Sequence, residues 1–413
     1  MSKVLISLLG TGRSAKGDNN KNIYATTDYT LEGRLYPSET LVANAMIAHY
    51  GIDRLFVIGT AESMWDNLAE IFESDDEVYY EILRQKEKKT LTQDSLNDLN
   101  NSIVKKLGSA GSKCFLVIDG KSKNELWDIF GSFIEILDLL NDGDEVYFDI
   151  THLFRSHSIM SFVMSQFGQT YKKFKIAGFF YGMLVKDEPS PIINLREFYK
   201  FAEWSNAINM LNSYGNGDSL KMLLNDSDES KEIKNAFSEF SDALSIADMG
   251  SMQQSFKRLA GQIKAFENSN NHIVKILSKQ LVRFIKRFDV DESLSKFQFQ
   301  LAKWYAESAN YAMAYITLTE AAISVKCEVN GYDSTKKDDR DKAKKELFSL
   351  KDWKSSLQEQ NKIGNAFSKV SNIRKNIAHK ISANSVDRGS KSSPKNSVEN
   401  FDNYFATLSK IGK

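Results

Sequence analysis

Cysteine and proline are both scarce in this sequence, with 2 cysteines and 4 prolines among 413 residues. The two cysteines, Cys114 and Cys327, are far apart, and neither has another Cys or a His at metal-ligand spacing. This excludes a disulfide framework like that of small secreted domains, and it excludes a zinc site of the usual spacing. We therefore expect a protein of a reducing, cytoplasmic environment that holds no metal.

Long apolar runs and an excess of charge of either sign are also missing. The first residues, MSKVLISLLGTGRS, contain an apolar segment of strand length and no small-residue cleavage site. No stretch approaches the roughly 20 apolar residues of a membrane span. Lys+Arg and Asp+Glu number 54 each, so only local charge can argue for or against nucleic acid. We expect no membrane association, and the length predicts two domains.

The first half of the chain alternates between short apolar runs and helical patterns. Because the runs are continuously apolar, they indicate strands buried on both faces, and the alternation predicts a parallel α/β sheet with helices on both sides. The expected strands are 4–9, 55–58, 115–118, 146–150 and 176–181. The expected helices are 38–50, capped by Ser38, then 63–72, two within 76–108, 124–140 and 156–167. Residues 22–35 predict a β-hairpin.

The pattern changes after Pro189 and Pro191, because no convincing strand follows residue 195. Amphipathic stretches at 256–266, 273–288, 301–325 and 362–377 predict an all-helical second half. We place the domain boundary near residue 195, giving domains 1–195 and 196–413. Residues 382–396 are rich in Ser, Lys and Asn and predict a mobile loop before a last helix from about Val398.

A first candidate site is the run Gly10-Thr11-Gly12-Arg13-Ser14, which directly follows the first strand. In an open α/β sheet, ligands bind beyond the carboxyl ends of the strands. Glycines there let backbone N–H groups approach an anion, and the Thr, Arg and Ser side chains add donors for phosphate. A plain strand-to-helix turn would also need glycine, so this run alone does not decide between the two.

A second candidate is the segment DITHLFRS, residues 149–156, at the end of a late strand. It places Thr151, His152 and Arg155 at one strand end, and no Asp or Glu occurs from Ile150 through Lys186. The positive electrostatic potential expected from a basic segment without acidic residues suits a polyphosphate ligand. A helix start capped by Thr151 or Ser156 is the plainer interpretation, and both can hold together. Thr60, after the strand at 55–58, would close the rim of the same site.

A third candidate is RKNIAH, residues 374–379, at the end of an amphipathic helix whose core positions we expect to be Ile363, Phe367, Val370 and Ile377. Arg374, Asn376 and His379 lie off that stripe or at the helix end. Between residues 371 and 396 the basic residues are Arg374, Lys375, Lys380, Arg388, Lys391 and Lys395, against the single acid Asp387. Positive charge concentrated in this way is typical of RNA binding, although a solvated basic helix end is the plainer alternative.

Together and in this order, the motifs resemble the CARF–HEPN ribonucleases that accompany type III CRISPR systems. The resemblance covers nearly the whole chain. DITHLFRS is close to the D-x-T-H-G-F-R-S signature of that family, and RKNIAH matches the R-x4-6-H motif of HEPN nucleases. Leu153 departs from the signature, where glycine is usual, and this leaves the size of the ligand ring open.

The resemblance implies a Rossmann-like α/β CARF domain followed by an all-α HEPN domain, in a cytoplasmic homodimer. The CARF domains of that family bind a cyclic oligoadenylate across the dimer axis as allosteric activator. Carried over by position, Gly10, Thr11, Gly12, Arg13 and Ser14 would hold phosphates. Thr60, Thr151, His152 and Arg155 would complete the site. We favour cyclic tetra-adenylate over hexa-adenylate, and degradation of the activator by this domain stays open.

The same resemblance implies an endoribonuclease that cuts single-stranded RNA without a metal or other cofactor, by attack of a 2′-OH on the adjacent phosphate. In that chemistry His379 transfers protons, since imidazole titrates near neutral pH. Arg374 stabilises the charge that builds on the phosphorane, and Asn376 orients one of them or the substrate. Two protomers would form one composite cleft.

Two other functions are compatible with parts of the sequence. A CARF sensor with a catalytically inactive HEPN domain would act as a binding module, and intact Arg374 and His379 argue against it. A nucleotide-dependent oxidoreductase would share the parallel sheet and the glycine turn. It would need a GxGxxG motif and substrate machinery in the second half, and neither is found.

Overall fold

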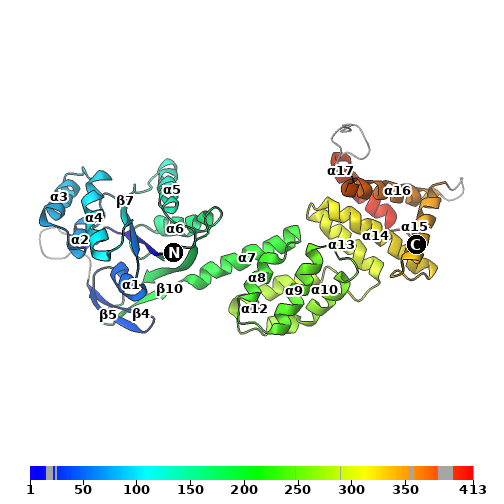
Figure 1. Cartoon of the computed structure of the whole chain (residues 1–413), viewed down its shortest axis with the longest axis horizontal. Coiled ribbons are helices and arrows are strands. Elements are labelled where there is room, and N and C mark those ends of the chain that lie inside the picture. The colour runs from blue at the N-terminus through cyan, green and yellow to red at the C-terminus, as the bar shows by residue number, and fades with distance from the viewer. Residues whose placement is uncertain are drawn as a thin grey trace. The chain divides into compact units, whose positions relative to one another are not determined.

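The computed structural model describes residues 1–14, 22–23, 26–246, 248–288, 290–352, 358–379 and 394–412 (Figure 1). The chain divides into two compact units, residues 1–200 and 201–413. The division lies within helix α7 (Arg196–Tyr214), which begins next to the boundary expected from the sequence. The identity of the two units as CARF and HEPN domains stays a prediction. No helix in these ranges is long and apolar enough to cross a membrane.

The first unit is built on an eight-stranded sheet in the order β5-β4-β10-β9-β8-β1-β6-β7. Its five parallel-core strands are the predicted ones: β1 (Lys3–Leu9), β6 (Arg54–Gly59), β7 (Lys113–Leu116), β8 (Glu145–Asp149) and β9 (Lys175–Gly182). Strands β4 (Thr27–Leu31), β5 (Arg34–Glu39) and β10 (Ser190–Asn194) extend the sheet on the β9 side. A separate small ladder pairs β2 (Arg13–Ser14) with β3 (Asn22–Ile23).

Helices cover both faces of this sheet, as the continuously apolar strands predict. One core lies under α1 (Val42–Tyr50), α2 (Trp65–Ile71), α3 (Asp76–Glu87), the 3₁₀ turn η1 (Asp94–Leu96) and α4 (Asn97–Leu107). The other lies under α5 (Lys123–Asp138) and α6 (Arg155–Gly168). Successive residues of β1 alternate between these cores, with Leu5 in the first and Val4 and Ile6 in the second.

The hairpin prediction is confirmed in kind but was placed too early. Its turn is Glu32-Gly33, with φ angles of 49° and 81°, the two left-handed residues that a tight hairpin requires. The prediction that Ser38 caps a helix is wrong, because β5 continues to Glu39 and α1 begins at Val42. Pro37 lies within β5, which the sheet tolerates because β5 is an edge strand.

Strand β10 was missed because we took Pro189 and Pro191 as the sign of a domain boundary. Pro191 pairs in register with Thr30 of β4, whereas the residues from Ile192 onward pair with β9. The proline lies where the strand passes from one partner to the other. Its carbonyl accepts a hydrogen bond from Met183 N at 2.9 Å, and its missing N–H is not needed there.

The second unit is helical: among the described residues after Asn194, every regular element is a helix. After α7 come α8 (Asp218–Asn225), α9 (Lys231–Ser245), α10 (Met252–Gly261), α11 (Ile263–Glu267) and α12 (His272–Ile285). Then follow α13 (Leu294–Glu307), α14 (Tyr311–Asn330), α15 (Lys337–Ser349), η2 (Leu350–Asp352), α16 (Gln358–His379) and α17 (Pro394–Leu408).

Three details of this unit differ from the sequence prediction. The stretch 256–266 is divided between α10 and α11, which are separated at Gln262. The stretch 301–325 is divided between α13 and α14, because Ala309 takes a left-handed φ of 56° and the Asn310 side chain caps the second helix. The last helix begins at Pro394, before Val398. Most of the predicted loop 382–396 lies outside the described residues.

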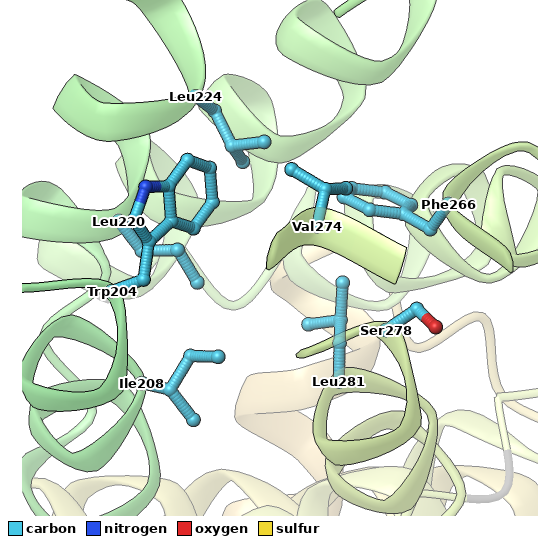
Figure 2. Close-up of a pocket in the computed structure, with 8 residues that line it drawn as sticks. All are labelled: Trp204, Ile208, Leu220, Leu224, Phe266, Val274, Ser278 and Leu281. Carbon is cyan, nitrogen blue, oxygen red and sulfur yellow. The ribbon is translucent and has the colours of Figure 1, made fainter. Parts of the chain in front are cut away.

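A small cavity lies in the core between α7, α8, α11 and α12 (Figure 2). Its lining is Trp204, Ile208, Leu220, Leu224, Phe266, Val274, Ser278 and Leu281. The hydroxyl of Ser278 donates to Lys275 O at 2.7 Å, so the one hydroxyl of the lining is satisfied within its own helix. The cavity therefore belongs to the packing of the helices and offers no polar anchor for a ligand.

Candidate functional site

The loops that follow β1 and β8 meet at one edge of the sheet. Both β6 and β8 pair with β1 in parallel, and they lie on opposite sides of it. From β1 the chain moves to β6 and β7, then returns to place β8 on the other flank of β1. The order of strands thus reverses between β1 and β8, and in open α/β sheets ligands bind at the carboxyl ends of the strands at such a point. The first and second candidate segments therefore lie at the carboxyl ends of two neighbouring strands.

The loop after β1 is anchored by its backbone. Gly10 is buried, and its carbonyl accepts a hydrogen bond from Met64 N at 3.0 Å. Thr11 and Gly12 are half-buried, and Gly12 has a φ of 71°, a conformation that favours glycine. Arg13 and Ser14 form β2 directly afterwards, and their side chains lie outside what the structure describes. The chain thus turns sharply at Gly12 beside the switch point.

The loop after β8 is held by a buried carboxylate. Asp149 is fully buried, and its oxygens accept hydrogen bonds from Ser7 Oγ at 2.7 Å and from Thr151 N at 3.0 Å. The Thr151 hydroxyl oxygen in turn accepts from Gly182 N at 2.9 Å. Sequence reasoning gave no role to Asp149 or Ser7, although a polar residue within each apolar strand was the available signal. Together they join the ends of β1, β8 and β9.

Leu153, the departure from the family signature, takes a φ of 72°. The loop thus keeps the left-handed geometry that suits glycine, at a cost of roughly 1 kcal/mol for a side chain with a Cβ. Leu153 offsets this cost by packing against the core under α5 and α6. This loop therefore combines a left-handed turn with an apolar side chain that packs on the core.

Helix α6 begins at Arg155, which is exposed. The prediction that Thr151 or Ser156 caps this helix is wrong: Phe154 is the N-cap residue, and no side chain makes the capping hydrogen bond. The reason is that Thr151 already bonds to β9 and lies before the left-handed turn at Leu153. Thr151, His152 and Arg155 nevertheless follow one strand end, as predicted.

Two histidines lie near this site, and burial lowers the pKa of both. For His152 the nearby charge of Asp149 partly opposes the effect. For His157 the carbonyl of Ile118, 3.3 Å from Nε2, partly opposes it. Each imidazole is therefore neutral at pH 7 and offers a ligand no charge. The positive charge of the described part of this segment comes from Arg155 and not from histidine.

Thr60 lies behind the loop after β1 and not on an open rim. Its side chain is 1% exposed, its N–H donates to Ser63 Oγ at 2.9 Å, and its carbonyl accepts from Trp65 Nε1 at 2.8 Å. Ser63 Oγ in turn donates to Leu9 O at 2.6 Å. This turn braces the end of β1. Direct contact between Thr60 and a ligand stays a prediction and would require the turn to open.

The third candidate lies on α16. Its buried stripe is Ile363, Phe367, Val370 and Ile373, so the prediction that Ile377 belongs to the core is wrong. Ile377 is 44% exposed because the stripe ends at Ile373, before the helix does. Lys375 is exposed and Asn376 half-buried. His379 is the last residue of α16, and its side chain lies outside what the structure describes.

Arg374 is held by an acid that sequence reasoning missed. Its Nη2 lies 3.0 Å from Glu320 Oε1, on α14. The other oxygen of Glu320 pairs with Arg340, on α15. The signal was present, because Glu320 is the only charged residue from Tyr311 to Val325. Within the described ranges, no group of three or more His, Cys, Asp or Glu could hold a metal ion.

Comparisons with known proteins agree with the CRISPR context. A family model described as the second domain of CRISPR-associated protein MJ1674 matches residues 200–294. The CRISPR-associated protein MJ1674 of Methanocaldococcus jannaschii is 29% identical over 437 residues. That alignment covers 99% of this chain and 66% of the relative, so the chain spans slightly less than two thirds of the relative's length.

Among solved structures, Enterococcus italicus Csm6 bound to cyclic hexa-2′-fluoro-hexa-dAMP matches 99% of this chain and 93% of its own chain. The TM-score is 0.40 and the sequence identity 12%. The chain is thus similar, along nearly its whole length, to a CRISPR-associated protein.

Proposed function

We propose that this protein is a cyclic-oligoadenylate-activated, metal-independent endoribonuclease of type III CRISPR defence. The observation that carries the proposal is the meeting of the two signature loops, 10–14 and 151–155, at the switch point between β1 and β8. The motif RKNIAH at the end of α16 supplies the nuclease half. The similarity to a CRISPR-associated protein supports the setting.

The proposed activator site lies at the carboxyl ends of β1 and β8. The glycine turn at Gly12 exposes backbone to an anion, and Arg13 and Arg155 provide charge for the phosphates. No acidic residue from Ile150 through Lys186 offsets the positive charge of this segment. A ring of several phosphates fits this chemistry better than a single nucleotide, and we favour cyclic tetra-adenylate.

The proposed cleavage site lies in the helices that follow the matched second domain, which ends where α13 begins. Arg374 would stabilise the charge on the phosphorane, His379 would transfer protons and Asn376 would orient the substrate. We propose that Arg374 and His379 of two protomers form one composite cleft, as the resemblance to HEPN nucleases implies.

A homodimer needs a surface, and α6 offers one. Ile159, Val163 and Phe167 repeat every fourth residue along it and are 67%, 49% and 44% exposed. Trp127 of α5, 62% exposed, packs edge-on against Phe130, which in turn contacts Phe167. No charged residue occurs from Ser156 through Tyr171. A two-fold contact brings like residues together, so a neutral apolar face suits a second copy of this chain.

The test is incubation of the protein with unstructured RNA and EDTA, without activator and with cyclic tetra-adenylate or hexa-adenylate. We expect cleavage with one of the two rings, no cleavage without activator, and none in Arg374→Ala. Cleavage that needs a divalent ion would contradict the metal-free chemistry. The alternative of a sensor with an inactive helical half predicts tight ring binding and no cleavage in any arm.

A companion measurement tests the surface. Val163→Asp should convert the dimer to a monomer in sedimentation experiments, because it places two charges against each other across the axis. Tyr80→Asp is the matched control, since Tyr80 is 65% exposed on α3, away from this face. A dimer that persists in Val163→Asp would move the interface elsewhere.

A further inference from the structure

Glu320 is a charged residue in the otherwise uncharged first part of α14. It is the only charged residue among the first fifteen positions of α14, from Tyr311 to Val325. Its side chain is only 18% exposed. A carboxylate so far removed from water is costly unless cations and hydrogen bonds compensate it. The partners of Glu320 must therefore supply this compensation.

Both carboxylate oxygens are engaged, each by a different arginine from a different helix. Oε1 lies 3.0 Å from Arg374 Nη2, and Oε2 pairs with Arg340 Nη2. Arg340 is itself fixed, because its Nη1 donates to Ser334 O at 3.1 Å and to Ser324 Oγ at 3.3 Å. Arg340 thus holds Glu320 in place, and Glu320 in turn holds Arg374.

The three side chains differ in their exposure to solvent. Glu320 and Arg340 are 18% and 22% exposed, whereas Arg374 is 39% exposed. A guanidinium has five N–H donors, so pairing with one carboxylate oxygen occupies only part of it. The arginine is held at one end and remains accessible to a phosphate at the other.

We propose that Glu320 is a positioning residue for Arg374, and that Arg340 fixes Glu320 in turn. The inference rests on the proposed function, in which Arg374 contacts the phosphate that is cut. Without the carboxylate, Arg374 keeps its charge and its attraction for RNA but loses its fixed direction. An interaction weakened mainly in the transition state lowers kcat more than it changes KM.

The test is steady-state cleavage of a short single-stranded RNA by Glu320→Gln at saturating activator. We expect kcat to fall by about tenfold or more, with KM changed by less than about twofold, since misplacement of a catalytic group has effects of this size. Glu346→Gln is the matched control: Glu346 also bridges α14 and α15, through Asn330 and Lys326, and contacts neither Glu320 nor Arg374. Its kcat should equal that of the wild type.

A double-mutant cycle separates positioning from a general effect on the fold. In the slow variant Arg374→Lys, the further change Glu320→Gln should cost little, because the residue acts through the arginine. Equal losses in both backgrounds would overturn the proposal, as would an unchanged kcat in Glu320→Gln. Cleavage by Glu320→Gln without activator would also overturn the proposal, because it would show that Glu320 holds the enzyme in its inactive state.

Circular dichroism shows whether the variant folds. If Glu320→Gln does not fold, Arg340→Gln takes its place: it should lower kcat in the same way, and an unchanged kcat there overturns the proposal. A wild-type protein that cuts no RNA with any activator overturns the proposed function itself, and with it this inference. The two failures are therefore distinguishable.

Discussion

The two candidate sites each contain a carboxylate, which is buried for Asp149 and half-buried for Glu320, and the two carboxylates have different partners. Asp149, in the sheet unit, accepts hydrogen bonds from the Ser7 hydroxyl and the Thr151 backbone, both neutral. Glu320, in the helical unit, pairs with two arginines. The first fixes the path of a backbone, and the second fixes the direction of a charge. A carboxylate thus orders loops at the candidate site of the sheet unit and orients a cationic side chain at the candidate site of the helical unit.

The largest expected effect is in the helical unit. Arg374→Ala and His379→Ala should each reduce RNA cleavage by about a hundredfold or more, as expected for loss of an electrostatic stabiliser or a general acid–base group. Calorimetry should show nearly unchanged affinity for the cyclic oligoadenylate, since both residues lie in the other unit.

Mixed dimers sharpen this prediction. Dimers with one wild-type and one His379→Ala protomer should cut much more slowly than half the wild-type rate, because the proposed cleft is shared. A rate near one half would show that each protomer holds a complete site. Cleavage in the double variant would place the chemistry outside α16.

The next effect is in the sheet unit. Arg13→Ala and Arg155→Ala should raise the activator concentration needed for half-maximal cleavage by roughly tenfold, since a charge-assisted hydrogen bond contributes about 1.5–3 kcal/mol. The maximal rate should stay close to that of the wild type. If instead the maximal rate collapses at an unchanged activator dependence, these arginines are not ligand contacts.

A third prediction compares the two carboxylates directly. Asp149→Ala should lower the free energy of unfolding by about 2–4 kcal/mol, because it leaves the Ser7 hydroxyl and Thr151 N–H buried without an acceptor. Asp149→Asn should cost much less, since an amide can still serve two neutral partners. Chemical denaturation measures both. A loss in Asp149→Asn equal to that in Asp149→Ala would show that the charge itself matters there, as we propose for Glu320.

The smallest effect concerns pH. Burial lowers the pKa of His157 in the folded protein, so the unfolded chain binds a proton more readily. The stability that results is fully present above about pH 6.5, the ordinary pKa of histidine, and is lost as the pH falls towards the lowered value. His157→Gln should reduce this acid dependence, so that its melting temperature falls less than that of the wild type as the pH is lowered from 8. An identical pH profile would assign the dependence to other groups.

The parts of the fold that the sequence predicted are those decided by local pattern. The continuous apolar runs of β1, β6 and β8 predicted strands buried on both faces, and the structure contains these strands. The ligand site that we place at the polar residues directly after them stays a prediction. Strand β10 could not be predicted in this way, because Pro191 argues against a strand unless its change of partner is known.

The candidate site in the helices shows the same limit. The spacing of Arg374 and His379 was visible, whereas the pairing of Arg374 with Glu320 joins residues of α14 and α16 that only the packing of the helices brings together. Ile377 was assigned to the core because it continues the spacing, and nothing local shows where the buried stripe ends. The spacing of apolar residues predicts which face of a helix is buried, but it does not predict which polar residues of two helices contact each other.

The pairing of β4 with β10 has a consequence for how the protein folds as it is synthesised. Residues 27–31 leave the ribosome early, and their partner at 190–194 is the last strand of the sheet to be made. Until then the β4–β5 hairpin lacks its place in the sheet and presents an open edge. Because this contact spans nearly the whole unit, it closes a large loop and slows the final step of folding. Any nascent chain that stops before residue 190 therefore exposes an unpaired strand, which makes this stage the one most prone to aggregation.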